Sequence, residues 1–159
     1  MCIRDSDTFL PMTERAYPTG ELRNVRGTPH DLQTLTNLYS GLHADDQQIK
    51  IGKGYDNYWL VNSNVLAGQE YAAKVIEPIS GREMTLFTDQ PSMILYTANY
   101  IDGSHIGKQG VRYQQRAGLC LEPQRANNRQ HGANINNTLL TPEQPFFSRS
   151  TYCFSVSNS

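Results

Sequence analysis

The 159-residue sequence lacks any apolar run long enough to cross a bilayer, and it lacks an excess of charge, since its net charge is −1. A spanning helix needs about 20 consecutive apolar residues, and a nucleic-acid-binding surface needs clustered lysine and arginine. We therefore expect neither a membrane nor a nucleic acid as a partner. Internal repeats and low-complexity tracts are also absent, so repeat architectures are excluded.

Cysteine is scarce as well, with only Cys2, Cys120 and Cys153 in the chain. Their number is odd and their spacing contains no C-x-x-C pair, which argues against a zinc or redox site. Cys120 and Cys153 each lie in an apolar, strand-like pattern. We therefore predict that both are small buried hydrophobic residues.

The sequence contains many short β-like runs separated by turns, and glycine (12) and proline (8) mark several of those turns. The runs Glu70–Glu77 and Arg82–Gln90 flank Pro78-Ile79-Ser80-Gly81, which predicts a hairpin. Further strands are predicted at Met93–Asn99, Gly118–Gln124 and Ser150–Val156. Leucines spaced by three and four between Leu32 and Leu42 predict one short helix. The pattern as a whole predicts an all-β protein, an antiparallel β-sandwich with at most one short helix.

The most distinctive strand runs through Leu119-Cys120-Leu121-Glu122-Pro123-Gln124. Because side chains alternate faces along a strand, the two leucines point one way, and Cys120, Glu122 and Gln124 point the other. An unpaired buried carboxylate is costly. Glu122 is therefore either a surface acid or a residue kept on this face for a function.

Other motifs accompany this strand in a fixed order. They are Pro18-Thr19-Gly20-Glu21, Val25-Arg26-Gly27-Thr28-Pro29-His30-Asp31, Gly54-Tyr55-Asp56, Thr88-Asp89-Gln90-Pro91, Tyr96-Thr97-Ala98-Asn99 and Leu121-Glu122-Pro123-Gln124. Together they resemble the C-terminal half of the aldose 1-epimerase (galactose mutarotase) family, whose fold is a large β-sandwich (a supersandwich). The resemblance runs from about Asp7 to the end, so residues 7–159 are expected to be the C-terminal portion of that domain. Residues 1–6 match nothing in the family, and we expect them to be a spurious leader.

The resemblance implies an enzyme that interconverts the α and β anomers of aldohexoses such as glucose and galactose. A base removes the proton of the anomeric hydroxyl while an acid protonates the ring oxygen, and reclosure gives the other anomer. The motifs imply that Glu122 is the catalytic base and that Asp56, Asn57 and Gln90 bind the sugar. The partner is then a small aldose. No metal or other cofactor is required, because the reaction moves only protons.

The resemblance also implies that part of the enzyme is missing. Family members are much longer, and their N-terminal half carries the general-acid histidine in an N-H-x-Y-F-N-L segment. None of His30, His43, His105 and His131 lies in such a segment. We therefore expect a fragment that lacks the N-terminal half of the same enzyme and is inactive alone. A cytoplasmic location is expected, with periplasm and secretion left open because the true N-terminus is expected to be absent.

The sequence departs from the family pattern next to two of these motifs. Asn57 stands where many relatives have histidine, and Arg125-Ala126-Asn127 follows Gln124 where many have an aromatic residue and then Pro-Asp. Two other functions therefore stay open. One is a non-catalytic sugar-binding sandwich, and the other is a glycosidase that uses Asp56 and Glu122 as its carboxyl pair.

Purely structural interpretations of the single residues also stay open. Asp56 could belong to a turn before a strand, and Gln90, just before a proline, could simply end a strand. Tyr55, Tyr58 and Trp59 could be core aromatics instead of surfaces on which a sugar stacks.

Overall fold

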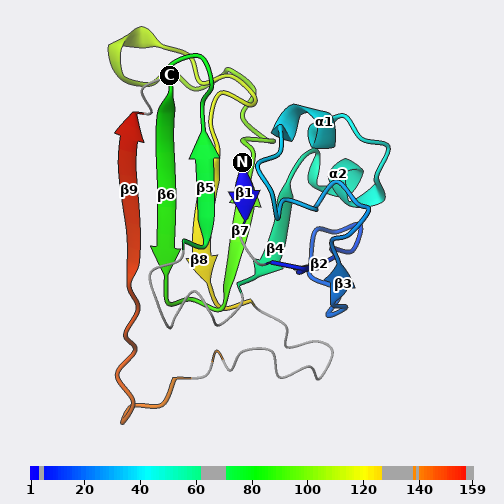
Figure 1. Ribbon diagram of the computed structural model, residues 1–159, viewed down its shortest axis with the longest axis vertical. Helices are drawn as coiled ribbons and strands as arrows, with labels where there is room; N and C mark the ends of the chain where they lie inside the picture. Colours follow the sequence, from blue (N-terminus) through cyan, green and yellow to red (C-terminus); the bar gives the residue numbers. More distant parts are fainter. Residues whose placement is uncertain (4–5, 62–70, 127–137, 139, 157–159) are drawn as a thin grey trace.

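Two antiparallel sheets form the molecule, and the computed structural model describes them over residues 1–3, 6–61, 71–126, 138 and 140–156 (Figure 1). The four-stranded sheet has the order β1-β5-β6-β9, with strands Cys2–Ile3, Ala73–Ile76, Arg82–Thr88 and Ser150–Val156. The five-stranded sheet has the order β3-β2-β4-β7-β8, with strands Arg23–Asn24, Thr8–Leu10, Asp56–Leu60, Ser92–Tyr96 and Cys120–Gln124. All neighbouring strands run antiparallel, as the sequence predicts.

The predicted hairpin is confirmed by β5 and β6, which pair from Ala73↔Leu86 to Ile76↔Glu83. Gly81 in its turn has a φ of +69°, in the left-handed region that glycine tolerates. Glu70, the first residue of the predicted run, lies outside the described residues. Strands β8 and β9 also lie inside the predicted runs, and β7 begins one residue before its predicted run, at Ser92.

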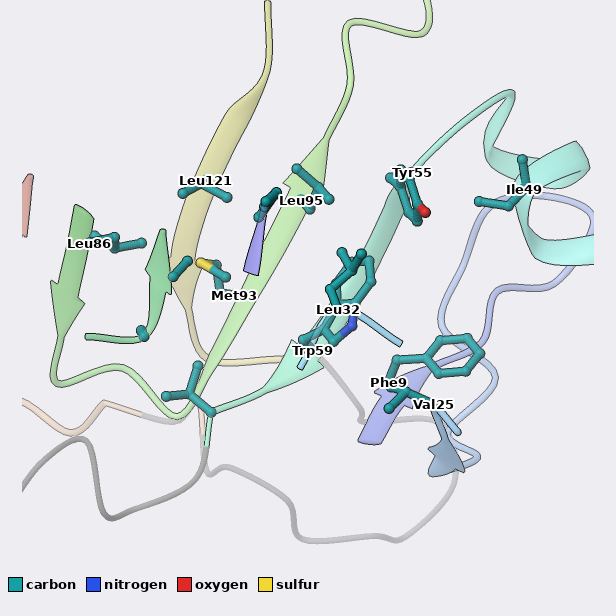
Figure 2. Packing of buried hydrophobic residues seen from close by; sticks show 14 residues of the cluster. Phe9, Val25, Leu32, Ile49, Tyr55, Trp59, Leu86, Met93, Leu95 and Leu121 are labelled. Carbon is teal, nitrogen blue, oxygen red and sulfur yellow. The ribbon is translucent and has the colours of Figure 1, made fainter. Parts of the chain in front are cut away.

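The hydrophobic core lies on one face of the five-stranded sheet (Figure 2). Its first part packs Met93, Leu95 and Leu121 of β7 and β8 against Leu86 and Ala73 of the other sheet, which makes the sandwich. Its second part packs Trp59 of β4 and Phe9 of β2 against the segment 25–52. The residues contributed by that segment are Val25, Leu32 and Ile49. One sheet face is therefore covered from β2 to β8.

The prediction of at most one short helix is wrong, because the segment that covers β2 and β4 contains two. Helix α1 spans only Leu38–Leu42, within the predicted stretch, and α2 spans Gln47–Gly52. The Asp46 side chain caps α2 by accepting from the amides of Gln48 and Ile49. A six-residue helix is too short to show hydrophobic periodicity, so its cap was the only local signal. A 3₁₀ turn, η1, spans Lys108–Gly110.

Residues 1–3 are part of this fold. Cys2 and Ile3 pair with Lys74 and Ala73 of β5, and the Met1 amino group donates to the Thr36 carbonyl at 2.6 Å. Met1 itself is buried. Residues 4–5 lie outside the described part, and the origin of residues 1–6 stays a prediction.

The prediction that Cys120 and Cys153 are buried is wrong. Both are exposed, free thiols, because each lies on the outermost strand of its sheet. An apolar run predicts a strand but does not say whether another layer covers it. Within the described ranges, no helix is long and apolar enough to cross a membrane.

Candidate functional site

The candidate site lies on the opposite face of the five-stranded sheet from the core. The register places Asp56, Tyr96 and Cys120 in one row and Tyr58, Ile94 and Glu122 in the next, and Leu60, Ser92 and Gln124 form the third. Asp56, Glu122 and Gln124 therefore share a face, as alternation along β8 predicts for the last two. By ideal sheet spacing, the Cα atoms of Asp56 and Glu122 lie about 12 Å apart, diagonally across β7.

A network of hydrogen bonds, which we call the clasp, fixes the turn that precedes Asp56. Asn99 Nδ2 donates to the carbonyls of Gly52 and Tyr55, both at 2.8 Å. The Tyr55 amide donates to Thr97 Oγ1 at 3.1 Å, and that hydroxyl donates to Asn99 Oδ1 at 2.7 Å. Thr97 and Asn99 are buried. The Y-T-x-N motif thus acts by fixing the start of β4.

Gly54 and Arg116 complete the clasp. Arg116 Nη1 donates to Asn99 Oδ1 at 2.7 Å, and its Nη2 donates to the Lys53 carbonyl. Gly54 has a φ of +143°, and a Cβ there would lie 2.2 Å from Asn99 Oδ1 and 2.4 Å from Arg116 Nη1. Only glycine fits between these groups. Arg116 was missed as a positioning residue because nothing in its local sequence signals the long-range contact.

The two carboxyl groups of the site differ in environment. Asp56 is about half buried, and burial, followed by repulsion from Glu122, raises its pKa from 3.8 to about 6. Glu122 is exposed at the outer strand β8. Asp56 therefore has a pKa close to neutral pH, whereas the family resemblance implies the base role for Glu122.

Gln90 lies where the chain crosses from β6 in one sheet to β7 in the other. It lines a hollow of about 350 Å³ together with Pro123, Gln124, Arg125, Thr138, Leu140, Phe146 and Ser148. Gln90 Nε2 donates to Ser148 Oγ at 2.8 Å and to Asp89 Oδ1 at 3.1 Å. The volume is at the lower end for small-molecule sites. Gln124 lines this hollow, and Glu122 lies two residues before it on the same face of β8, about 7 Å away.

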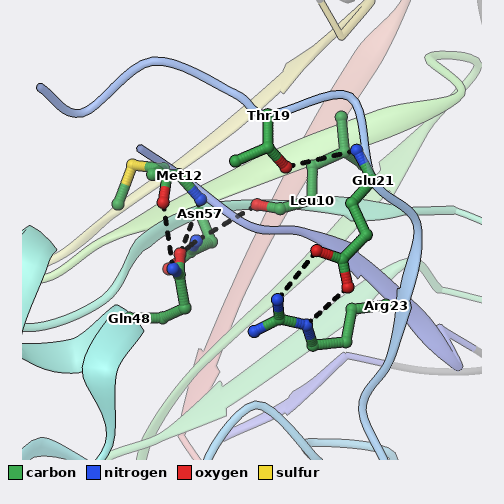
Figure 3. A network of polar contacts seen from close by, with 7 residues as sticks. All are labelled: Leu10, Met12, Thr19, Glu21, Arg23, Gln48 and Asn57. Carbon is green, nitrogen blue, oxygen red and sulfur yellow. Dashed lines mark hydrogen bonds and ion pairs between the residues drawn. The ribbon is translucent and has the colours of Figure 1, made fainter. Parts of the chain in front are cut away.

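Asn57 does not belong to this group, and its assignment as a sugar-binding residue needs correction. It follows Asp56 on β4, so it points to the core face, where it is fully buried. Its Nδ2 donates to the Leu10 carbonyl at 3.1 Å and to Gln48 Oε1 at 3.2 Å (Figure 3). Its Oδ1 lies 3.1 Å from His30 Nε2. Asn57 here holds helix α2 and the segment around His30 against the sheet.

The aromatic residues around Asp56 divide in the same way. Tyr55 and Trp59 are fully buried in the core, where Tyr55 Oη donates to the Pro29 carbonyl and Trp59 Nε1 to the His30 carbonyl. Tyr58 points to the site face, and its hydroxyl donates to Gln124 Oε1 at 3.1 Å. The sequence left open whether each of these three aromatic residues lies in the core or faces a sugar. Their burial separates the two core residues from Tyr58.

None of the histidines that the structure describes lies on a strand of the sheet that carries Asp56 and Glu122. His30 is buried on the core side, His43 caps α1 and stacks on Tyr39, and His105 is exposed in a loop. His131 lies outside the described residues. No cluster of three or more potential metal ligands occurs in the part of the chain that the structure describes.

Comparison with known proteins agrees with this arrangement. The sequence model of the aldose 1-epimerase family matches residues 3–153. Galactose mutarotase from Sus scrofa is 34% identical over 153 residues, which cover 96% of this chain and 42% of the relative. Aldose 1-epimerase from Escherichia coli K12 is 30% identical over 118 residues, or 74% and 33% of the two chains. The chain thus spans less than half the length of the curated relatives it matches.

Solved structures share the fold. The aldose epimerase homologue from C. elegans superimposes with a TM-score of 0.80 at 22% identity, over 98% of this chain and 45% of that one. Galactose 1-epimerase from Lactobacillus acidophilus gives 0.74 at 23% identity, over 98% and 43%. The family match over nearly the whole sequence, supported by the shared fold, leads to one conclusion. This chain belongs to the aldose 1-epimerase family.

Proposed function

We propose that this chain supplies the carboxylate half of a mutarotase site, which interconverts the α and β anomers of an aldohexose such as glucose or galactose. The observation that carries the proposal is the placement of Asp56 and Glu122 on one sheet face, close enough for Glu122 to raise the pKa of Asp56. This arrangement occurs within a stretch matched to the aldose 1-epimerase family.

Glu122 is the proposed base. Its carboxylate projects from the free face of β8, beside a hollow lined by Gln124 and Gln90. A sugar seated over this face would present its anomeric hydroxyl to Glu122, which removes the proton and returns it to the opened aldehyde on reclosure. Proton transfer of this kind contributes about 10²–10⁴-fold to rate.

Asp56 is the proposed anchor for the sugar hydroxyls. Its place is fixed by the Gly54–Asn99–Arg116 clasp, so it can hold a hydroxyl without reorganising. A carboxyl group with a pKa of about 6 is mostly ionised at neutral pH and then accepts hydrogen bonds from hydroxyl groups.

The acid that protonates the ring oxygen is proposed to come from residues outside this chain. His30 cannot serve, because it is fully buried on the other side of the sheet and bonded to Asn57. On this proposal residues 1–159 alone equilibrate anomers no faster than a protein-free solution, and the protein that adds the missing acid is active.

Polarimetry of freshly dissolved α-glucose and α-galactose tests the proposal on that longer protein. Glu122→Gln keeps the shape but removes the base, so kcat should fall by about 10²–10⁴-fold. Glu14→Gln, at an exposed turn remote from β8, is the matched control and should keep wild-type activity. Near wild-type mutarotation by Glu122→Gln would refute the assignment.

Two further measurements separate the two alternatives. A non-catalytic sugar-binding sandwich would bind sugar in equilibrium dialysis without accelerating mutarotation. A glycosidase would release the leaving group from an aryl glycoside, and that release would depend on both Asp56 and Glu122.

A further inference from the structure

Strand β9 forms an outer edge of the four-stranded sheet that is open to pairing. Within the described residues β9 pairs only with β6, along its full length from Thr88↔Ser150 to Arg82↔Val156 (Figure 1, red). All seven of its residues are exposed. Tyr152 is opposite the core residue Leu86, so Tyr152, Phe154 and Val156 face the same side as the core. Phe154 is nevertheless 74% exposed.

The sequence of β9 has none of the features that protect an edge from pairing. Ser150–Val156 contains no charged residue, no proline and no glycine. The outer strand of the other sheet, β8, contains Glu122 and Pro123, and β1 and β3 are only two residues long. Proteins blunt exposed edges with charge, proline or shortness. Strand β9 is therefore the edge suited to accept another strand.

The backbone of β9 presents, at fixed positions, hydrogen-bonding groups that no described strand uses. The Asp89 amide donates to the Arg149 carbonyl at 3.1 Å, directly beyond the pair Thr88↔Ser150. Arg149 thus directs its backbone carbonyl toward the chain that continues β6. Because hydrogen-bonded and non-hydrogen-bonded pairs alternate along an antiparallel ladder, the backbone N–H and C=O groups of Cys153, four residues further on, also point toward β6. The groups that point outward belong to Ser150, Tyr152, Phe154 and Val156.

We propose that β9 pairs with β9 of a second copy, antiparallel and symmetric about Cys153, which joins two four-stranded sheets into one. Tyr152 then faces the second copy's Phe154 in a hydrogen-bonded pair, and the reciprocal pair forms on the other side of the twofold axis. Aromatic cross-strand pairs stabilise sheets, and a neutral strand meets its copy without repulsion. A twofold interface uses the same patch on both copies, and β9 offers such a patch.

The symmetry makes a specific geometric prediction at the centre. Cys153 and the second copy's Cys153 form a non-hydrogen-bonded pair, whose Cα atoms are about 4.5 Å apart in antiparallel sheets. Disulfides span Cα separations of about 4.4–6.8 Å. Both thiols lie on the outer face of the sheet, opposite Thr85 and away from Leu86, so an oxidant reaches them.

Sedimentation velocity of residues 1–159 in reducing buffer tests the pairing. We expect a concentration-dependent species of twice the chain mass. Phe154→Lys places a charge in the interface and should give the monomer. Phe147→Lys is the matched control, because Phe147 is also 74% exposed but lies outside β9, and it should leave the dimer intact. Circular dichroism checks that both variants stay folded.

Cross-linking tests the register in chains that keep Phe154. In a Cys2→Ser background, diamide oxidises two thiols to one disulfide and takes up the two hydrogens. The covalent dimer should form with Cys120→Ser and be lost with Cys153→Ser. A wild-type chain that stays monomeric would overturn the proposal. A dimer that survives Phe154→Lys, or a cross-link that requires Cys120 in place of Cys153, would also overturn it.

Discussion

The raised pKa of Asp56 predicts a stability that depends on pH in an unusual direction for an aspartate. Burial and the neighbouring Glu122 raise its pKa from 3.8 to about 6, so the folded chain holds the Asp56 proton more tightly than the unfolded chain does. The stabilising contribution of that proton is complete below pH 4. It is lost as the pH rises through about 6. Replacing Asp56 with asparagine removes this dependence.

The magnitude follows from the shift. A difference of about two pKa units corresponds to about 3 kcal/mol at 1.36 kcal/mol per unit. Because Asp56 is only half buried, water screens part of the effect, and we expect about 1–2 kcal/mol. Relative to wild type, Asp56→Asn should therefore gain about 1–2 kcal/mol in free energy of unfolding between pH 4 and pH 7.

Urea unfolding of both proteins at pH 4, 5, 6 and 7, followed by circular dichroism, measures this difference. Titrating groups that do not interact with Asp56, including His30, contribute equally to both proteins and cancel. Asp102→Asn is the control. Hydrogen bonds from Ser104 lower the pKa of Asp102, so its contribution to stability changes below about pH 4 and that variant should stay parallel to wild type from pH 4 to pH 7. A difference between wild type and Asp56→Asn that stays constant over this range would refute the reasoning.

Three further predictions concern the residues around Asp56. Gly54→Ala should lower the free energy of unfolding by more than about 1 kcal/mol, because its Cβ would meet Asn99; an unchanged urea midpoint would contradict this. Asn57→Ala should cost about 1–3 kcal/mol by leaving buried partners such as the Leu10 carbonyl unpaired, as measured by the same unfolding. In the longer protein of the proposed function, Asp56→Asn should raise KM more than Glu122→Gln does and lower kcat less, by polarimetry. A collapse of kcat at constant KM would instead make Asp56 the catalytic residue.

The strands and the common face of Glu122 and Gln124 could be predicted because both depend on local alternation. The β5–β6 hairpin follows from a turn ending in Gly81, and strand β8 follows from the leucines that alternate with Cys120 and Glu122. The pairing of β4 with β7, which brings Asp56 and Glu122 to one surface, joins residues distant in sequence. Local patterns do not specify such pairing.

The error at Asn57 was avoidable. Adjacent residues on a strand point to opposite faces, so Asp56 and Asn57 cannot both face a sugar over β4. Asn57 was assigned to sugar binding because many members of the family have histidine at the position that follows Asp56. The alternation of side chains along the strand predicts that Asn57 points to the face opposite Asp56.

The exposed cysteines and the second helix lay beyond sequence reasoning for a different reason. Whether Cys153 is buried depends on which layer covers β9, and that layer is a property of the assembled sheets. Helix α2 depends on packing of Ile49 and on Gln48, whose side chain bonds both backbone groups of Met12. Tertiary contacts thus stabilise a helix that is too short to be stable alone.

The network around Asn57 also determines the chemical character of His30. Since the Asn57 amide nitrogen donates to Leu10 and Gln48, its oxygen faces His30 Nε2, which must carry the hydrogen. Among the residues that the structure describes, His30 Nδ1 has no hydrogen-bond partner, and burial lowers the pKa of the ring. The imidazole stacks on Phe9 with centroids 4.1 Å apart and planes 5° apart. One tautomer is therefore locked, and this histidine serves as a flat aromatic ring with a single N–H, closer in behaviour to the indole of tryptophan than to a base.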